Sequence, residues 1–238
     1  VALIDEFQDT DPVQYRIFNR VYNVEANSPD TCLLMIGDPK QAIYGFRGAD
    51  IYTYLQARLG VQARTYTLGK NFRSAESMVS AVNRVFEYSD QHSTKGAFLF
   101  GKGDSTPMPF QGVDANGTKR QWAVQGDIQP SLVFWTHESG KTDNQGNPKG
   151  LAKGTATTEV AETCASEIAR LLTLGQAKQA GFALPDNPDD LEPVEPKDIA
   201  VLVNNRNEAA AVRDALGRRR IKSVYLSDRD SVLTSQEA

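Results

Sequence analysis

The sequence is short of the residues that build metal centres and disulfide frameworks. Its 238 residues include two cysteines, Cys32 and Cys164, and two histidines. Each cysteine lies in a segment whose apolar residues recur periodically, which is not the pattern of a disulfide framework or a metal site. Two isolated cysteines cannot supply the framework of a disulfide-rich secreted domain. We therefore expect no disulfide, no cysteine-based metal site, and a reducing, cytoplasmic setting.

Long apolar runs and an excess of positive charge are also missing. No run approaches the roughly 20 apolar residues that a membrane-spanning helix requires, so we expect no membrane partner. The formal net charge is −4, and the overall field therefore repels phosphate. Any contact with nucleic acid must come from a local basic or aromatic surface. The chain opens within an apolar run, without a basic leader, and we expect it to be an excised fragment.

The first part of the sequence predicts one βαβ unit of a parallel sheet. Residues 1–4 form an apolar run typical of a strand that is buried on both faces. Asp11 and Pro12 are a helix cap and first-turn pair, and residues 32–36 form a second apolar strand. The strands end in acidic residues: Asp5, Glu6 and Asp38. Ligands of open α/β sheets bind at the carboxyl ends of strands, so we expect a nucleotide beside these acids.

The remaining sequence predicts a second α/β domain after a loop-rich stretch. Helices are predicted near Asp50, over residues 74–88 with Ser74 as the cap, and over residues 158–175 and 208–216. Strands are predicted at residues 65–68, 132–135, 199–203 and 221–225. Residues 89–153 have poor periodicity, and the acidic, proline-rich residues 184–196 are interpreted as a linker.

Two segments carry chemistry typical of a nucleoside triphosphatase. Such an enzyme needs one carboxylate for the water shell of Mg²⁺ and another to orient the attacking water. Asp5 and Glu6 fit both roles, although a solvated strand end is the commoner explanation for an isolated Asp-Glu pair. Gln41 follows the second strand and can reach a γ-phosphate. Tyr44 and Phe46, shortly after it, offer flat faces on which bases can stack.

Three segments resemble motifs of the UvrD-like DNA helicases, and they occur in that family's order. Residues 5–10 (Asp-Glu-Phe-Gln-Asp-Thr) resemble the Walker B motif, residues 37–49 the third motif, and residues 71–74 (Asn-Phe-Arg-Ser) the fourth. The Asp-Pro-Lys-Gln form of the third motif and the segments 198–203 and 223–232 most resemble the RecB type, the beta subunit of exodeoxyribonuclease V.

The resemblance implies an α/β fold with a RecA-like parallel sheet and flanking helices, the core of P-loop NTPase helicases. Residues 1–70 would be the C-terminal half of the first motor domain. Residues 71–238 would be the N-terminal part of the second, with a loop-rich insertion over about 90–155. The resemblance also implies ATP and Mg²⁺ as cofactors. The implied partners are single-stranded and double-stranded DNA and, in the parent complex, RecC-like and RecD-like subunits.

The resemblance further implies roles for individual residues. Asp5 would bind Mg²⁺ through water, and Glu6 would be the general base for attack on the γ-phosphate. Gln41 would sense the γ-phosphate, Arg73 would stabilise its charge as an arginine finger does, and Phe72 would stack near the adenine. The DNA-facing residues would be Tyr44, Phe46 and Arg47, with Phe46 standing where many relatives carry tryptophan.

Several of these features have simpler explanations. Tyr44 and Phe46 could be core aromatics, because aromatic residues usually bury. Arg73 could be a surface charge, although a helix N-terminus is an unfavourable place for a cation without an anionic partner. The basic cluster 218–222 is more typical of a solvated helix end than of a phosphate contact.

The sequence offers one false match to a phosphate-binding loop. Residues 139–142 (Ser-Gly-Lys-Thr) lack the glycine that such a loop needs five residues before Gly-Lys, and Trp135 occupies that position. We expect the true loop to precede Val1, and we expect the isolated chain to hydrolyse ATP poorly.

The predicted function belongs to the parent protein. It is an ATP-dependent DNA helicase, with an exonuclease in the RecB type, that couples ATP hydrolysis to translocation on single-stranded DNA and to unwinding in double-strand break repair. Two alternatives stay open: an AddA-type or stand-alone UvrD/Rep-like repair helicase, and a non-catalytic scaffold that keeps the helicase fold.

Overall fold

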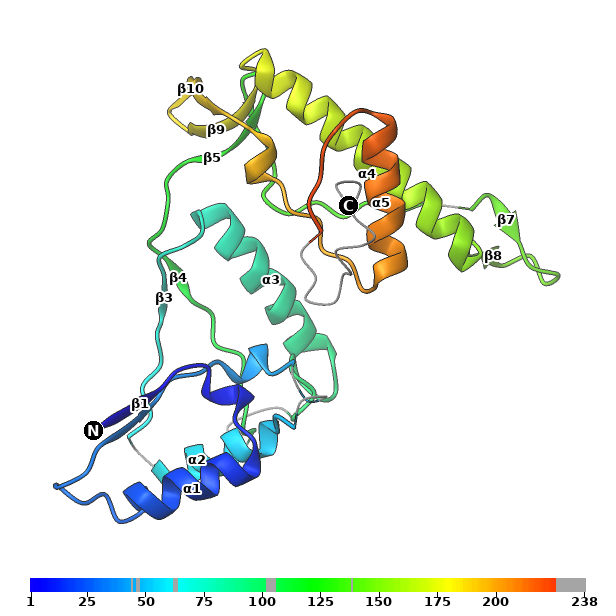
Figure 1. Ribbon diagram of the computed structural model, residues 1–238. Helices are drawn as coiled ribbons and strands as arrows, with labels where there is room; N and C mark the ends of the chain where they lie inside the picture. The colour runs from blue at the N-terminus through cyan, green and yellow to red at the C-terminus, as the bar shows by residue number, and fades with distance from the viewer. Residues whose placement is uncertain (44, 46–47, 62–63, 102–105, 138, 226–238) are drawn as a thin grey trace, which may run out of the picture. The chain divides into compact units, whose positions relative to one another are not determined.

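The computed structural model describes residues 1–43, 45, 48–61, 64–101, 106–137 and 139–225 (Figure 1). Internal contacts divide the chain into two compact units, Val1–Gly117 and Thr118–Ala238. Each unit combines helices with short strands, so the fold is mixed α/β.

The first unit begins with the predicted βαβ arrangement. β1 (Ala2–Ile4) and β2 (Leu33–Met35) pair in parallel, and α1 (Pro12–Tyr22) connects them. The carboxylate of Asp11 caps α1 by accepting hydrogen bonds from two N–H groups of its first turn. A capping Asp followed by Pro is a strong helix start, because Pro lacks an N–H group that would otherwise stay unpaired. The βαβ arrangement and the Asp11 cap are confirmed. The prediction that the two strands are buried is wrong, because Leu3 of β1 and Leu34 of β2 are 59% and 50% exposed.

Aromatic packing fixes the chain immediately after β1. Phe7 in η1 (Phe7–Asp9) is 2% exposed, and its ring centroid is 5.9 Å from Tyr15 of α1 and 6.0 Å from Tyr54 of α2 (Ile51–Val61). Burial of each large ring contributes roughly 1.5–3 kcal/mol. Phe7, Tyr15 and Ala57 form a buried apolar cluster, and Phe7 joins it to the end of β1, next to the predicted carboxylates Asp5 and Glu6.

The second strand pair of this unit is very short. β3 (Lys70–Asn71) pairs in parallel with β4 (Asp114–Ala115). The predicted strand at residues 65–68 is wrong, because this segment has no strand pairing and its Tyr66 and Leu68 are 91% and 86% exposed. An apolar, β-branched segment becomes a strand only where a neighbour accepts its backbone hydrogen bonds.

α3 (Glu76–His92) was predicted correctly, but its predicted cap is wrong. Ser74 does not cap it: the N-cap is Ala75, which makes no side-chain hydrogen bond to the helix. Asn71 instead orders the approach, because its Oδ1 accepts hydrogen bonds from the N–H groups of Arg73 and Ser74 at 2.9 and 2.8 Å. Such Asn turns hold the backbone locally without any tertiary contact.

The second unit contains an antiparallel sheet that the sequence did not predict. Its strands, in the order β10-β9-β5-β6, are β10 (Asn187–Pro193), β9 (Ala180–Leu184), β5 (Gln121–Val124) and β6 (Asp127–Ile128). Because β9 and β10 form a hairpin, the prediction of a linker over residues 184–196 is wrong. β10 is an edge strand, and edges tolerate the prolines and acids that made this segment look like a linker.

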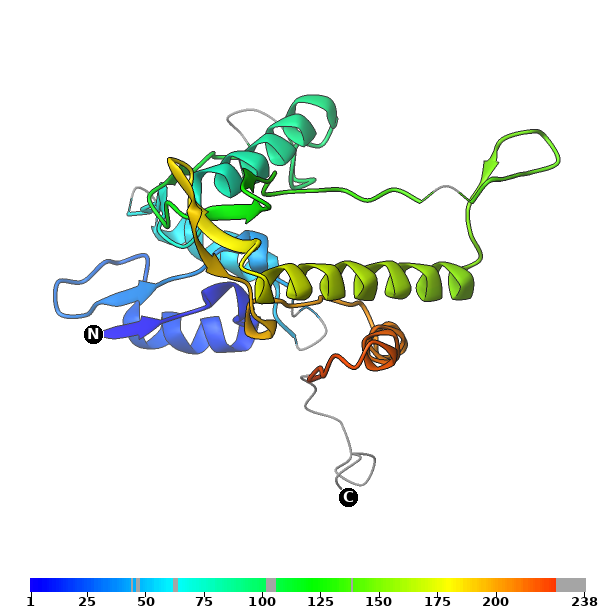
Figure 2. The ribbon, with the colours of Figure 1, turned by 90° about the horizontal axis from the view of Figure 1, so that it is seen from above.

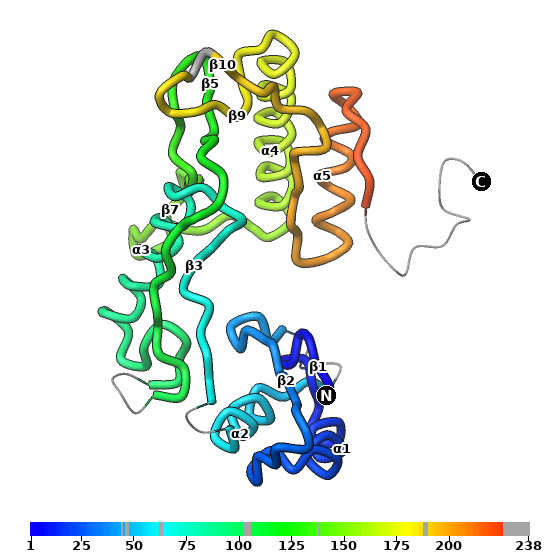
Figure 3. Tube along the Cα trace, turned by 90° about the vertical axis from the view of Figure 1, so that its left-hand side faces the viewer, coloured from blue at the N-terminus to red at the C-terminus, as the bar shows by residue number. Residues whose placement is uncertain are grey.

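Two helices lie side by side in this unit (Figure 2, Figure 3). α4 (Lys153–Gln176) and α5 (Arg206–Arg218) were both predicted, and both extend beyond the predicted bounds. The contact between them is built from buried residues, most of them small: Ala161, Ala165, Ile168, Ala215 and Leu216. Small side chains let two helix backbones approach closely, and each apolar contact removes surface from water.

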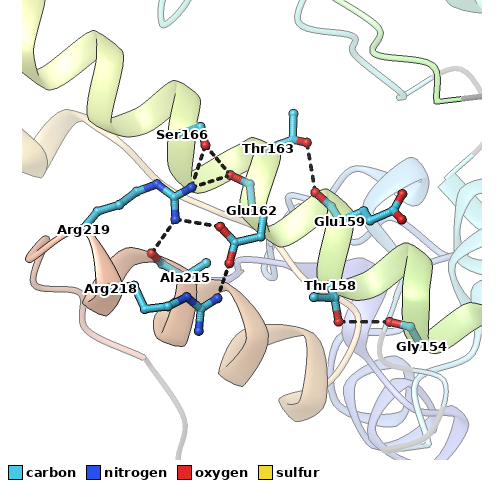
Figure 4. Close-up of polar contacts among 9 residues, drawn as sticks. All are labelled: Gly154, Thr158, Glu159, Glu162, Thr163, Ser166, Ala215, Arg218 and Arg219. Atoms are coloured by element: carbon cyan, nitrogen blue, oxygen red, sulfur yellow. Dashed lines mark hydrogen bonds and ion pairs between the residues drawn. The ribbon is translucent and has the colours of Figure 1, made fainter.

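Charged side chains also join α4 to α5 (Figure 4). The carboxylate of Glu162 binds the guanidinium groups of Arg218 and Arg219, the latter at 2.8 Å, and Arg219 also donates to the Ser166 hydroxyl at 2.7 Å. Hydrogen bonds from Arg218 and then Arg219 lower the pKa of the Glu162 carboxyl. Two cations of the cluster 218–222 therefore bind α4, and the cluster is not simply a solvated helix end.

Three predicted strands of the second unit are wrong. Residues 132–135, 199–203 and 221–225 have no strand pairing, and their apolar side chains include Trp135, Leu202 and Val224 at 61%, 98% and 86% exposure. The strand prediction failed because β-forming side chains need both a partner strand and a packed face. A small exposed hairpin, β7 (Lys141–Thr142) with β8 (Pro148–Lys149), precedes α4.

Both parallel sheets formed by the described residues are two-stranded. A RecA-like sheet therefore stays a prediction. Among the residues that can be described, none of the helices has the length and apolar character of a transmembrane segment.

Candidate functional site

The predicted carboxylates follow β1 directly and are both exposed. Glu6 has left-handed backbone angles, φ 50° and ψ 42°, and its N–H donates to Asp5 Oδ1 at 3.0 Å. A residue other than glycine pays roughly 1–2 kcal/mol for this conformation. Strained residues of this kind concentrate at functional sites, where the surrounding structure holds them in place.

A buried glutamine connects the end of β1 to the end of β2. Gln8 is 2% exposed; its Nε2 donates to Glu6 Oε2 at 2.6 Å, and its Oε1 accepts from the N–H of Asp38 at 3.0 Å. A buried amide is costly unless both its donor and its acceptor are paired. The bonds to Glu6 and Asp38 use both ends of this one, so Gln8 fixes the two strand ends relative to each other.

Gly37 makes the close approach of these strand ends possible. A Cβ at this position would lie 2.7 Å from Gln8 Oε1, 3.0 Å from Gln8 N and 3.1 Å from Phe7 N. Two of these atoms belong to the backbone and cannot move aside. The N–H of Phe7 also donates to the carbonyl of Ile36 at 2.8 Å, which continues the strand pairing beyond β1. Only glycine fits between these segments.

Asp38 organises the residues that follow β2. It caps η2 (Pro39–Gln41): its carboxylate accepts from the backbone N–H of Lys40 at 3.0 Å and from Gln41 Nε2 at 3.2 Å, and it pairs with Lys40 Nζ at 2.7 Å. Burial acts to raise the pKa of the Asp38 carboxyl. The hydrogen bonds from Lys40 and Gln41 and the charge of Lys40 outweigh burial, so the pKa lies below its ordinary value.

Three predicted site residues thus belong to one local network. Gln41 binds Asp38, Asp38 binds Gln8, and Gln8 binds Glu6, which in turn binds the neighbouring Asp5. Glu6 and Gln41, which are 35 residues apart in the sequence, are thus linked through hydrogen bonds of 2.6 to 3.2 Å. Such a network can present a carboxylate and an amide to one ligand.

The other predicted residues lie elsewhere or outside the described structure. Phe72 and Arg73 follow β3, in the other strand pair, where Phe72 is 68% exposed and Arg73 is also exposed. Tyr44, Phe46 and Arg47 fall outside the described residues. The roles of all five in binding nucleotide or DNA remain predictions.

Sequence reasoning missed Gln8 and underused Asp38. The sequence showed an acid at the end of the second strand but gave no spacing rule that pairs it with a particular residue after the first. The available signal was a polar glutamine directly after the buried Phe7, in a segment flanked by apolar runs. A buried glutamine needs two partners, and the one that lies 30 residues away, the N–H of Asp38, cannot be identified from the sequence.

The donor set at this edge suits a hydrated cation. In the described part of the chain, no group of three or more His, Cys, Asp and Glu side chains could hold a metal ion. Asp5 is exposed at the strand end. Mg²⁺ is commonly bound by one or two carboxylates with water and substrate phosphates completing its shell, so Asp5 fits this role.

Comparisons with known proteins agree with these motifs. Residues 1–61 match the UvrD/REP helicase N-terminal domain family. The whole chain is 47% identical over 240 residues to the RecBCD enzyme subunit RecB of Escherichia coli (strain K12), and it covers 18% of that protein. It is 39% and 35% identical to the RecB subunits of Haemophilus influenzae and Mycobacterium tuberculosis, with 17% and 19% of these proteins covered. The chain therefore spans about a fifth of the length of these relatives, and the predicted resemblance is confirmed.

Proposed function

We propose, from the match of residues 1–61 to the UvrD/REP helicase N-terminal domain family and from the similarity to RecB subunits, that the chain is a segment of an ATP-dependent DNA helicase of the RecB type. The parent protein would couple ATP hydrolysis to translocation on single-stranded DNA and to unwinding of double-stranded DNA in break repair. The relatives are named as subunits of a RecBCD enzyme, which supports RecC-like and RecD-like partners.

The hydrogen-bonded series from Glu6 through Gln8 and Asp38 to Gln41 carries this proposal. It links a candidate general base to a candidate γ-phosphate sensor. Both stand at the carboxyl ends of neighbouring parallel strands, which is the edge where α/β sheets bind nucleotides.

Each residue of the series has a chemical task in the proposed reaction. Bound ATP with Mg²⁺ would supply the γ-phosphate and the cation that neutralises its charge. Asp5 would hold the metal through water. Glu6 would orient the attacking water and take its proton through Oε1, the oxygen that Gln8 does not bind. Gln41 would donate a hydrogen bond to the γ-phosphate.

The finer architecture belongs to the same proposal. Residues 1–70 would complete a first RecA-like domain, and residues 71–238 would open a second, with an insertion over about 90–155. Phe72 would stack on the adenine and Arg73 would stabilise the transferring phosphoryl group from that second domain. The proposed DNA contacts are Tyr44, Phe46 and Arg47.

The test is ATP hydrolysis by the full-length protein that contains this segment, measured with and without single-stranded DNA. Glu6→Gln should lower kcat by roughly 10²- to 10⁴-fold, because general base catalysis is lost while the side-chain shape is kept. Glu25→Gln, an exposed acid of the same unit outside the network, should leave kcat within about twofold.

Two results would contradict the proposal. A full-length protein without DNA-stimulated ATP hydrolysis would indicate the non-catalytic scaffold instead. Unchanged turnover in Glu6→Gln would show that another residue is the base.

The isolated 238-residue chain should hydrolyse ATP poorly, since its only Gly-Lys-Thr, residues 140–142, lacks the pattern of a phosphate-binding loop.

A further inference from the structure

We infer that Gln8 is a positioning residue that, with Asp38, mechanically couples the γ-phosphate sensor Gln41 to the general base Glu6. The inference rests on the proposed function and deepens it. It assigns a task to a side chain that is 2% exposed and whose hydrogen bonds join Glu6 to Asp38.

The amide of Gln8 can be held in only one orientation. Its NH₂ group faces a carboxylate oxygen of Glu6, and its carbonyl oxygen faces the N–H of Asp38. Rotating the amide by half a turn would bring two acceptors together at Glu6 and two donors together at Asp38. Each contact would change from attractive to repulsive. The bonds at the two ends therefore enforce each other.

The space around Gln8 leaves it no alternative position. The side chain is 2% exposed, and the Cα of Gly37 lies so close that an added Cβ would overlap Gln8 Oε1 at 2.7 Å. Packed interiors transmit displacement because their side chains have few other rotamers to adopt. A shift of the Asp38 backbone must therefore move Gln8, and with it the carboxylate of Glu6.

The far end of the series can bind a phosphate without breaking. Gln41 Nε2 donates one hydrogen to Asp38 Oδ2 at 3.2 Å, and the amide carries a second hydrogen that can reach an anionic oxygen. Gln41 is exposed, so this hydrogen is accessible to a ligand. Binding of a γ-phosphate would restrict the movement of Gln41 and of Asp38, to which Gln41 is hydrogen-bonded. Through Gln8 the same restriction would reach the carboxylate of Glu6.

The strained backbone of Glu6 is the element that this coupling acts on. Its backbone is left-handed, with φ 50°, and its carboxylate accepts a hydrogen bond from Gln8. Without that contact the Glu6 side chain loses a fixed direction. Misplacing a catalytic group by about 1 Å can lower turnover roughly 10²-fold. We expect nucleotide binding to be spared, because Gln8 is 2% exposed and offers almost no surface to a ligand.

The deciding variant is Gln8→Glu in the full-length protein. Glutamate keeps an oxygen for the Asp38 N–H but replaces the donor to Glu6 with a second acceptor. We expect kcat for DNA-stimulated ATP hydrolysis to fall roughly 10- to 100-fold, with KM for ATP changed by less than about threefold. The matched control is Thr53→Val, an equally buried polar residue of the same unit that lies outside the series and is 4% exposed. It should leave both constants unchanged.

Two further measurements separate coupling from loss of folding. Each kcat is divided by the concentration of sites that bind a non-hydrolysable ATP analogue, so unfolded protein does not count. Gln8→Met keeps the side-chain volume and removes both hydrogen bonds, and Asp38→Asn no longer accepts the bond from Gln41 in the same geometry. If the residues act in series, the double variant should lose no more activity than the more impaired single variant.

The outcomes distinguish this inference from the proposed function. A wild-type protein that shows no DNA-stimulated hydrolysis overturns the function and the coupling together. If Glu6→Gln lowers kcat but Gln8→Glu leaves it at the wild-type value, the coupling alone is overturned. The coupling is likewise overturned by an equal loss of nucleotide binding and turnover, or by a double variant whose loss is the product of the two single losses.

Discussion

Two of the polar networks formed by the described residues, one in each unit, join segments far apart in sequence and are built in opposite ways. In the first unit, the neutral side chain of Gln8 is almost fully buried. It donates a hydrogen bond to the Glu6 carboxylate and accepts one from the backbone N–H of Asp38, 30 residues away. In the second unit, Glu162 and Arg218, 56 residues apart, are joined by charged side chains on the surfaces of α4 and α5. The first network needs a glycine to exist, whereas the second needs only two helices already in contact.

This difference indicates what each network does. Exposed ion pairs are screened by water and salt and lose side-chain entropy when they form, so they add little to stability. A buried amide with both ends paired adds little net energy while intact, but it is costly to break. The buried network therefore specifies one geometry, and the exposed network follows packing that is set elsewhere.

The largest expected effect on the free energy of unfolding comes from adding a side chain at Gly37, which packs against Gln8 and Phe7. Gly37→Ala should destabilise the 238-residue chain by about 3 kcal/mol, because its Cβ meets two backbone nitrogens and a buried oxygen. Urea unfolding followed by circular dichroism measures this change. Gly69→Ala is the control, since an added Cβ there meets nothing within 4 Å. Equal midpoints for the two variants would show that the strand ends are not tightly packed.

The next effect tests whether packing, and not charge, holds α4 to α5. Ala165→Leu should destabilise by about 2 kcal/mol, because Ala165 is fully buried in the helix contact. Ala210→Leu, on the exposed face of α5, should change the free energy of unfolding by less than about 0.5 kcal/mol. A tolerated leucine at position 165 would mean that the helices pack loosely and that the ion pairs matter more than we infer.

The smallest effect is expected at the exposed network. Glu162→Gln should lower the unfolding midpoint less than Ala165→Leu does, and the difference from wild type should shrink further in 1 M NaCl, where the screening length is about 3 Å. If Glu162→Gln lowered the midpoint of urea unfolding as much as Gly37→Ala does, and did so at high salt as well, the distinction between the two networks would be lost.

The same carboxylate predicts a pH window. Hydrogen bonds from Arg218 and then Arg219 lower the folded-state pKa of Glu162 below its ordinary value of 4.5. The stabilisation is therefore present above pH 4.5 and is lost as the pH falls through the depressed folded-state pKa. Wild type and Glu162→Gln should differ in midpoint at neutral pH and converge in acid. A difference that grows in acid would reverse the sign and contradict this assignment.

The outcome of the predictions depended on the range of the interactions involved. The helices α1, α3, α4 and α5 were predicted because helical spacing is a local signal, strengthened at α1 by the capping residue Asp11. The strands at residues 132–135, 199–203 and 221–225 were predicted from composition alone, and they did not form because strands need partners. The β9–β10 hairpin was missed because acids and prolines are permitted on an edge, a position that composition cannot reveal.

By itself the sequence determined the order of motifs, the capped helix after Asp11 and the acids at the ends of the first two strands, because each is encoded within a few neighbouring residues. Only the tertiary structure decided that Gln8 would be buried between Glu6 and Asp38, and that Gly37 would leave room for it. Side chains remote in sequence meet only after two strands have paired in register. No local pattern contains that register.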